Sequence, residues 1–341
     1  MTRPHAPGHA PTARHAKQPG QAGAALLVAM LTVALVATLA SAALWQQWRQ
    51  VEIESAERGR SQTAWMMTGA LDWARLILRE DAVSAQGASV DHLGEPWALP
   101  VQESKLSSFL SQDQQWREDD AEVFLSGRIT DAQSRMNLAN LTEDGKPSPL
   151  ALAQLAALFD RLQLPQSELQ KLLDQWLTAQ PLNNNSIRQP VSGQSKAVPL
   201  VPQQTAQLRW MGLSAATLLA LQDHITVLPE PTPININTAS AEVLSASLVG
   251  FDLPSARQAV ALRARGHWAS LNAAREALGP AGLQLNDKQH SVQSRYFEVL
   301  GRMRIDNVVQ QELALMRREG NQVRMLWRVK SPQQSHSAPL Q

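Results

Sequence analysis

The chain has 341 residues, of which 44% are hydrophobic and 18% are charged, and it contains no cysteine. This length accommodates two domains and an anchor, because single domains usually hold roughly 100–200 residues. The lack of cysteine excludes disulfides, thiolate catalysis and cysteine-ligated zinc. The 31 basic residues nearly balance the 30 acidic ones, so no overall positive field attracts nucleic acid, although a local basic patch is compatible with this balance.

The amino terminus changes abruptly from polar to apolar. Residues 1–23 form a leader that contains basic residues and no acidic one, whereas residues 24–45 contain no charged residue at all. A helix of 22 residues is about 33 Å long, close to the roughly 30 Å thickness of the bilayer hydrocarbon. We therefore expect residues 24–45 to be a transmembrane segment. The basic leader predicts a cytoplasmic amino terminus and a chain that otherwise lies across the membrane.

Three interpretations of this segment compete. A secretory signal peptide has an apolar core of roughly 7–15 residues and a small-residue cleavage site; Ala40-Ser41-Ala42 offers such a site, but the apolar run is long for a secretory signal. An uncleaved signal anchor fits the length. The third interpretation depends on Gly23, which directly precedes the apolar run.

The junction at Gly23, with the sequence GAALLV, resembles the processing site of type IV prepilins and pseudopilins. The resemblance implies that prepilin peptidase cuts between Gly23 and Ala24, methylates the new amino group and leaves the apolar segment as anchor and assembly stem. Most pilin-like subunits have a glutamate at the fifth mature position, where this chain has Val28. A carboxylate at membrane depth is costly unless it is paired, and in the family its partner is the amino terminus of a neighbouring subunit. Loss of the acid suggests a subunit at the filament tip.

The helical pattern continues beyond the membrane. Residues 46–80 contain no proline and form the expected stem helix, with Met67, Leu71, Ala74 and Leu78 on one apolar face. Residues 24–80 would form either one helix of about 85 Å or an anchor, a kink near Gly59 and a separate helix.

Short extended runs are predicted on both sides of a long helical region. They cover Ala121–Leu125, Gly127–Thr130, Arg295–Ile305, Val308–Met316 and Val323–Val329. Glu319-Gly320-Asn321 is typical of a hairpin turn between the last two. In Asp131–Leu141 the asparagines favour a turn in which side chains bond the backbone. The polar residues 331–341 are expected to be a disordered tail.

The region between these strands has helical periodicity and the size of one domain. Predicted helices cover Pro149–Leu173, divided in two by Pro165, and then Ser214–His224, Ser240–Val249 and Ser255–Arg265. Residues 180–206 indicate a long loop. The predicted fold class is therefore α+β: a pilin-like α/β head, residues 81–141 and 291–330, with an all-helical domain inserted at residues 142–290.

The order of several segments resembles that of general secretion pathway protein K, the large minor pseudopilin of type II secretion systems. These segments are Gly23–Leu35, Ala70–Asp81, Asp91–Pro100, Ile129–Leu141 and Ile234–Leu244. The resemblance implies a single-pass protein of the bacterial inner membrane, with its bulk in the periplasm, that helps to initiate the pseudopilus and protein export across the outer membrane. The implied partners are I- and J-type minor pseudopilins, with the H-type as a further candidate, prepilin peptidase, and the secretion channel or exported proteins.

Part of the helical region also resembles a helix-hairpin-helix module, in which a glycine-rich hairpin presents amides to a phosphate of DNA. The hairpin here, Gly250–Pro254, has one glycine, an acid that repels phosphate and a proline without an N–H. Basic residues nearby are Arg257, Arg263, Arg265 and Arg275. We expect a structural module in which Asn235 and Asn237 act as capping or turn residues, and no nucleic-acid partner; a membrane-anchored DNA-binding protein is the alternative.

Calcium is associated with the protein K family, bound by clustered carboxylates in the helical domain. Calcium needs several oxygen ligands, but no Asp or Glu occurs from Gln175 to Gln222, and Asn183–Asn185 are neutral. We therefore expect no cofactor and no metal. The acidic run Glu118–Asp120 is expected to be a solvated turn. The histidines lack metal-ligand spacing, and neither a nucleophile elbow nor a phosphate-binding glycine loop is present, so we expect no enzyme activity.

Overall fold

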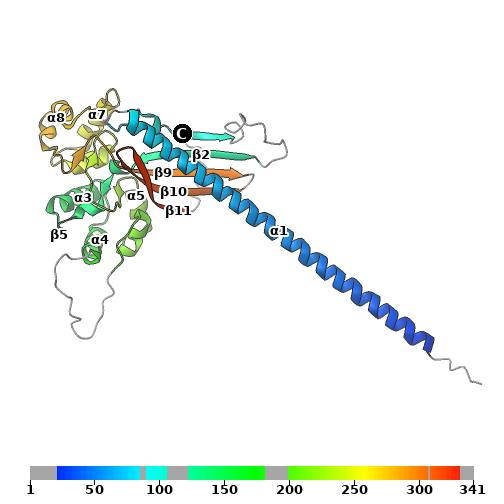
Figure 1. Cartoon of the computed structure of the whole chain (residues 1–341). Helices are drawn as coiled ribbons and strands as arrows, with labels where there is room; N and C mark the ends of the chain where they lie inside the picture. Colours follow the sequence, from blue (N-terminus) through cyan, green and yellow to red (C-terminus); the bar gives the residue numbers. More distant parts are fainter. Residues whose placement is uncertain (1–20, 85–89, 106–121, 181–198, 306–307, 331–341) are drawn as a thin grey trace, which may run out of the picture. The chain divides into compact units, whose positions relative to one another are not determined.

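The computed structural model describes residues 21–84, 90–105, 122–180, 199–305 and 308–330. The chain divides into two compact units, residues 1–64 and residues 65–341. The first element, α1 (Gln21–Ser84; Figure 1), contributes to both units and is helical along its whole length. The prediction of one helix over residues 24–80 is therefore confirmed, and the alternative with a separate second helix is wrong. The predicted disordered tail, 331–341, lies outside the described residues.

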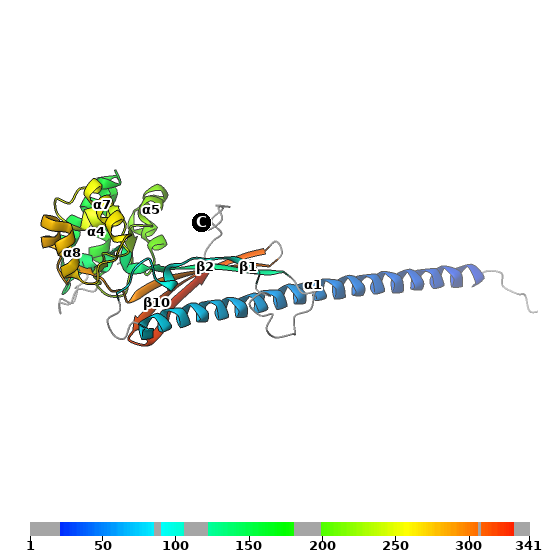
Figure 2. The same ribbon diagram turned by 90° about the horizontal axis from the view of Figure 1, so that it is seen from above.

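The second unit contains a five-stranded antiparallel sheet in the order β1-β2-β9-β10-β11. Its strands are β1 (Val101–Lys105), β2 (Val123–Asp131), β9 (Tyr296–Ile305), β10 (Val308–Glu319) and β11 (Gln322–Lys330). Residues of α1 beyond Ala64 pack against this sheet (Figure 2). The shared core contains Leu71, Ala74, Leu78, Trp97, Phe297, Val299, Ala314 and Met316. Strands on either side of the helical region thus form one sheet, as the α+β prediction requires.

One glycine of this sheet lies close to α1. Gly127 of β2 lies opposite Gly301 of β9 in the strand register. A Cβ at Gly301 would lie 2.8 Å from the sulfur of Met67 on α1, whereas one at Gly127 would lie 2.8 Å from the carbonyl oxygen of Leu300 within the sheet. A side chain at Gly301 would therefore displace Met67, and one at Gly127 would disturb the pairing of β2 with β9.

The helical region forms a second core of its own. It contains α3 (Pro149–Arg161), α4 (Gln166–Ala179), α5 (Ala215–Leu221), α6 (Ala241–Ser247), α7 (Leu253–Arg263) and α8 (Leu271–Leu278), with the 3₁₀ turns η4 (Thr205–Met211) and η5 (Gly279–Gln284). Leu158, Phe159, Trp176 and Ile236 are buried at its centre. Pro165 separates α3 from α4 as predicted, because its ring cannot continue a helix.

Short elements connect the sheet with the helical region. They are η1 (Pro96–Ala98), η2 (Ala132–Ser134), η3 (Leu138–Leu141), the parallel pairs β3 (Met136–Asn137) with β6 (Ile225–Thr226) and β7 (Ile234–Asn235) with β8 (His290–Ser291), and the antiparallel pair β4 (Thr142–Glu143) with β5 (Lys146–Pro147). Asn137 confirms the predicted turn chemistry, because its side chain accepts a hydrogen bond from the Ala139 amide at 3.1 Å. The predicted hairpin turn is also confirmed, with Gly320 at φ +54°.

Several boundaries differ from the prediction. The runs Ala121–Leu125 and Gly127–Thr130 form the single strand β2 from Val123, because the polar Ser126 between them keeps the register with β9. The expected loop 180–206 ends in η4, which begins at Thr205. The strand β1 and the helix α8 were not predicted. Residues 181–198 and the acidic run Glu118–Asp120 lie outside the described part of the chain.

Candidate functional site

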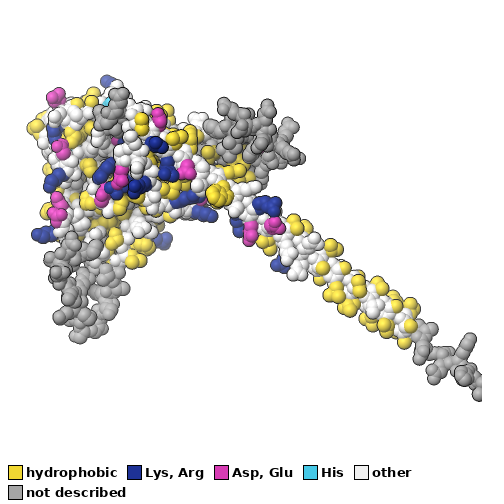
Figure 3. All heavy atoms as spheres, in the orientation of Figure 1, with side chains coloured by type: hydrophobic (Ala, Val, Ile, Leu, Met, Phe, Trp, Pro, Cys, Tyr) yellow, Lys and Arg dark blue, Asp and Glu magenta, His cyan; other side chains and the backbone are white. Residues whose placement is uncertain are grey.

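The predicted processing site lies at the start of α1. Gly23 and Ala24 are in its first turns, and Val28 is one turn further on, on the same face as Ala24. The Val28 side chain is 60% exposed, and the apolar residues from Leu26 to Leu44 are exposed to a similar extent. Figure 3 shows hydrophobic side chains along this part of the helix. The apolar stretch beginning at Ala24 is long and apolar enough to cross a membrane; a single such helix fits a single-pass anchor.

The few polar side chains of the apolar stretch bond their own helix. Thr32 Oγ1 donates to the carbonyl of Ala29, and Thr38 Oγ1 donates to that of Leu35. Ser41 Oγ donates to the carbonyl of Ala37. Because a lipid environment offers no hydrogen-bond partner, these internal bonds lower the cost of placing three hydroxyls there.

A buried polar junction joins the sheet to the helical region, and its centre is Asp131 at the end of β2. The Asp131 carboxylate accepts hydrogen bonds from the Gln133 amide (2.8 Å), Asn235 Nδ2 (2.9 Å), Thr238 Oγ1 (2.6 Å) and Ser294 Oγ (2.6 Å). Burial raises the pKa of Asp131, and these bonds to the ionised form oppose the rise. Residues more than 100 positions apart are therefore held together around one carboxylate.

Asn235 and Asn237 have the structural roles predicted for them. Asn235 Oδ1 accepts from the Asn237 amide at 3.0 Å. Asn237 bonds both the amide and the carbonyl of Trp268, each at 3.0 Å. The ININT segment thus supplies its asparagines to backbone turns and to Asp131, not to an exposed surface.

Arg318 of β10 forms the second half of this junction. Its guanidinium bonds Asp81 Oδ2 at 2.7 Å, Asp91 Oδ1 at 2.5 Å and the carbonyl of Ser294 at 2.9 Å. Asp91 is fully buried, Arg318 is 7% exposed and Asp81 is 12% exposed. The end of α1 is thereby joined to the carboxyl-terminal strands by a buried ion-pair network.

Glu95 completes a group of three carboxylates with Asp81 and Asp91, whose oxygens lie within 4.8 Å of one another. Glu95 Oε2 accepts from the His92 amide and from Trp97 Nε1, both at 2.8 Å. Burial raises the pKa of Glu95 to about 7, and it raises that of Asp91 to about 6 in spite of the neighbouring Arg318. The sequence analysis did not single out this group, because only the fold brings the three carboxylates together and pairs Asp81 and Asp91 with the distant Arg318.

These carboxylates do not fit a cation site as they are arranged. The Arg318 guanidinium occupies Asp81 and Asp91 and would repel a divalent ion. In the helical region, the described residues of the stretch 175–222 contain no acidic side chain to supply the hard oxygen ligands that calcium prefers. That the protein binds no calcium stays a prediction.

In the segment that resembles a helix-hairpin-helix module, several polar side chains bond the protein's own backbone. Asp252 caps α7 by accepting from the Ser255 amide at 2.9 Å, and Pro254 lies inside the helix instead of in the predicted hairpin. Arg263 is buried and donates to the carbonyls of Ile236 and Ala239. Arg275 bonds the carbonyl of Leu285 at 2.9 Å. Two of the four nearby arginines therefore bond the backbone of the fold, and the absence of a nucleic-acid partner stays a prediction.

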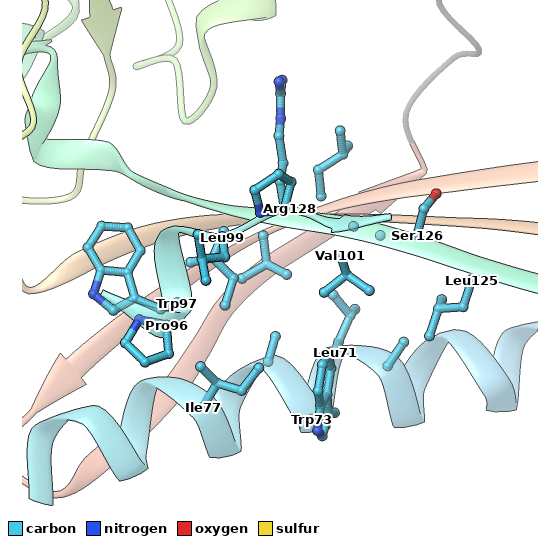
Figure 4. A pocket seen from close by; sticks show the side chains of 18 residues that line it. Leu71, Trp73, Ile77, Pro96, Trp97, Leu99, Val101, Leu125, Ser126 and Arg128 are labelled. Carbon is cyan, nitrogen blue, oxygen red and sulfur yellow. The ribbon is translucent and has the colours of Figure 1, made fainter. Parts of the chain in front are cut away.

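An apolar cavity of about 220 Å³ lies between α1 and the β1 side of the sheet. Figure 4 shows Leu71, Trp73 and Ile77 of α1 on one side and Val101 and Leu125 on the other. The polar groups among the lining side chains are those of Ser126 and Arg128 and the indole N–H groups of Trp73 and Trp97. The cavity can hold an apolar group, and its lining places no acid or base beside Ser126 that would activate the hydroxyl.

The comparisons with known proteins agree with this architecture. Models of the family "Type II secretion system (T2SS), protein K" match residues 134–230 and 234–293. Type II secretion system protein K of Pseudomonas aeruginosa is 28% identical over 299 residues, which are 82% of this chain and 84% of the relative. The protein K of Klebsiella pneumoniae is 27% identical over 273 residues, 74% and 78% of the two chains.

A solved structure has the same fold. The chain matches the crystal structure of the GspK-GspI-GspJ complex from the type 2 secretion system of enterotoxigenic Escherichia coli, with a TM-score of 0.60 and 20% identity. The match covers 81% of this chain and 98% of the other. The family models and the two relatives therefore indicate type II secretion system protein K as what this chain resembles, and the solved structure shows that the two chains share a fold.

Proposed function

We propose that this chain is a minor pseudopilin that caps the tip of the type II secretion pseudopilus, helps to initiate its assembly and thereby supports protein export across the outer membrane. The observation that carries the proposal is α1, in which an exposed apolar stretch continues into a helix that packs on the sheet of the head. Such a helix serves both as anchor and as stem. The role is structural and needs neither catalysis nor a bound cofactor.

Residues 24–45 would cross the inner membrane once, with the amino terminus in the cytoplasm and the head in the periplasm. The basic leader and the uncharged span support this orientation. Prepilin peptidase would cut between Gly23 and Ala24. Amino-terminal sequencing of the mature protein tests this: a methylated Ala24 is expected, a start near Ala43 would indicate a secreted protein, and an intact Met1 would indicate an uncleaved anchor.

A substitution at the cleavage site sharpens this test. Gly23→Leu should leave the leader in place and abolish processing, while the matched change Gly20→Leu, three residues earlier in the leader, should be processed normally. The two products differ by the mass of the leader and are separated by mass spectrometry. Equal processing of both variants would contradict cleavage at Gly23.

Val28 would mark the subunit that has no neighbour above it. A glutamate here would be a carboxylate at membrane depth without a partner, which costs up to about 3 kcal/mol near the bilayer centre. Val28→Glu should therefore lower secretion in a strain that lacks the wild-type chain, and Val28→Leu should not. If the Val28→Glu variant secretes as well as the wild type, Val28 no longer supports the proposal that this chain lies at the tip of the filament.

The partners are proposed from the solved relative, which was crystallised as a GspK-GspI-GspJ complex. The I- and J-type minor pseudopilins of the same bacterium should bind this chain, with an H-type subunit, the secretion channel and exported proteins as further candidates. Co-purification of the full-length chain with tagged I- and J-type subunits from detergent-solubilised membranes tests this. The assembly proposal fails if neither subunit is retained and secretion is unaffected by deletion of the chain.

A further inference from the structure

A surface hollow of about 660 Å³ lies between α1 and the turn that connects β10 with β11. It is lined by Asp72, Arg75, Leu76, Arg79, Asn321, Gln322, Val323 and Arg324. Arg75 ties its two sides together, because Nη1 bonds Asp72 at 2.7 Å while Nε and Nη2 bond the carbonyl of Val323 at 3.3 and 3.2 Å. The hollow is therefore preformed on a helix and a hairpin, both of which are anchored in the core.

The hollow has two positive charges without an acidic partner. Asp72 is neutralised by Arg75. Arg79 is exposed and makes no side-chain hydrogen bond or ion pair with any described residue. The exposed Arg324 bonds the amide oxygen of Gln322 at 3.3 Å and has no carboxylate within reach in the described part of the chain. A free guanidinium presents a planar donor fork that matches a carboxylate.

An apolar side chain lies beside these charges. Leu76 is 55% exposed and lies one helical turn before Arg79, on the same side of α1. An exposed apolar residue surrounded by arginines has the anatomy of a small protein interface, in which an apolar centre excludes water and a polar rim gives specificity. Nucleic acid or an anionic membrane would be bound by a broader field, typically four to eight basic residues for a lipid surface, and this hollow offers two uncommitted ones.

We propose that this hollow docks an acidic segment of a protein partner, whose carboxylates bind Arg79 and Arg324 while an apolar side chain covers Leu76. The argument uses residues of the second unit alone. It therefore holds whether or not the chain caps a pseudopilus, and its test does not measure secretion.

Photo-crosslinking in cells tests the proposal with the full-length chain. Leu76→benzoylphenylalanine should crosslink to a protein segment in which mass spectrometry finds Asp or Glu close to an apolar residue. The same replacement at Leu219, which is exposed on α5, is the control for non-specific capture. A crosslink no stronger than at Leu219 overturns the proposal, as does capture of lipid, of nucleic acid or of a segment without acids.

Charge reversal separates docking from mere proximity. Arg79→Glu with Arg324→Glu should lower the crosslinking yield about tenfold, because two attractions become repulsions. The matched pair Arg257→Glu with Arg265→Glu, two exposed arginines elsewhere in the second unit, should leave it unchanged. Replacing the acids of the captured segment with Arg should restore the yield. An unchanged yield in a variant with a normal unfolding midpoint overturns the proposal; if the variant does not fold, Arg79→Gln with Arg324→Gln replaces it.

Discussion

Two stretches of the same helix, α1, meet opposite environments. In residues 24–45 the apolar side chains cover all sides and are exposed, as in Leu31 with 69% of its surface accessible. In residues 65–84 the buried apolar side chains form one face that includes the fully buried Leu71 and Leu78, while Leu76 on the opposite side is exposed. The backbone is the same, so the distribution of side chains around the helix decides whether it is suited to lipid or to a protein core.

The polar side chains of the two stretches also find their hydrogen-bond partners in different places. The hydroxyls of the first stretch bond carbonyls three or four residues away in the same helix. Asp81 near the end of the second stretch instead binds Arg318, which lies 237 positions further along the chain. A helix in lipid must satisfy its polar groups internally, whereas a helix on a protein core can use distant partners.

The largest effect is expected from breaking that distant partnership. Arg318→Ala leaves the carboxylates of Asp81 and Asp91 buried without their cation, which should lower the free energy of unfolding by about 4 kcal/mol. Denaturation of the full-length chain in detergent, followed by tryptophan fluorescence, measures this. Arg58→Ala, which removes the exposed pair with Glu54, should cost at most about 0.5 kcal/mol. Equal losses in both variants would show that Arg318 does not stabilise the junction.

A somewhat smaller loss should follow from a cavity under the second stretch. Leu71→Ala removes a fully buried side chain and should lower the free energy of unfolding by about 3 kcal/mol. Leu76→Ala is the matched control on the opposite, exposed side, with an expected change of at most about 0.5 kcal/mol. If Leu76→Ala proves as damaging as Leu71→Ala, α1 does not present the face described to the sheet.

A charged side chain introduced into residues 24–45 should impair membrane insertion and should leave the stability of the head unchanged. Leu35→Lys places a cation within the span, at a cost of roughly 2.5–3 kcal/mol for insertion. Extraction of membranes at alkaline pH should release this variant and retain the wild-type chain. Leu76→Lys should remain membrane-bound. Release of both variants, or of neither, would contradict the assignment of residues 24–45 as the span.

The smallest expected effect is a pH dependence that comes from the second unit alone, because residues 24–45 contain no titratable group. Burial raises the pKa of Glu95 from 4.5 to about 7, so the folded state binds the proton more tightly than the unfolded state. The resulting stabilisation is complete below about pH 4.5 and is lost as the pH rises through 7. Asp91, with its pKa raised from 3.8 to about 6, acts in the same direction.

Solvent screening at the partly exposed Glu95 reduces its share, so the free energy of unfolding should fall by about 2 kcal/mol between pH 5 and pH 8 from these groups. Glu95→Gln cannot ionise and should flatten this slope in denaturation experiments at the two pH values. Glu143→Gln, an exposed change in the same unit, is the control. A slope that is unchanged by Glu95→Gln would contradict the burial-raised pKa.

The features that the sequence predicted are those with a local cause. The uncharged run at residues 24–45 predicted an apolar helix of bilayer length. Pro165 predicted the boundary between two helices, and Glu319-Gly320-Asn321 predicted a hairpin turn. The α+β class was predicted because hydrophobic residues recur about every two residues in the strand regions and about every 3.6 residues in the helical region. The processing at Gly23, the meaning of Val28 and the limits of the insertion at 142 and 290 stay predictions.

The features that only the tertiary structure decided depend on residues far apart in the chain. β1 has the polar sequence VQESK and is a strand because β2 offers an edge to pair with. Asp91, Asp131 and Arg318 carry no local pattern, yet folding gathers them into one buried network. The sequence alone thus determined that α1 carries an apolar stretch long enough to span a membrane, followed by an amphipathic stretch, because both depend on the order of side chains along one helix. Which distant charges hold that head together was decided by the fold, because only burial gives these pairings their strength.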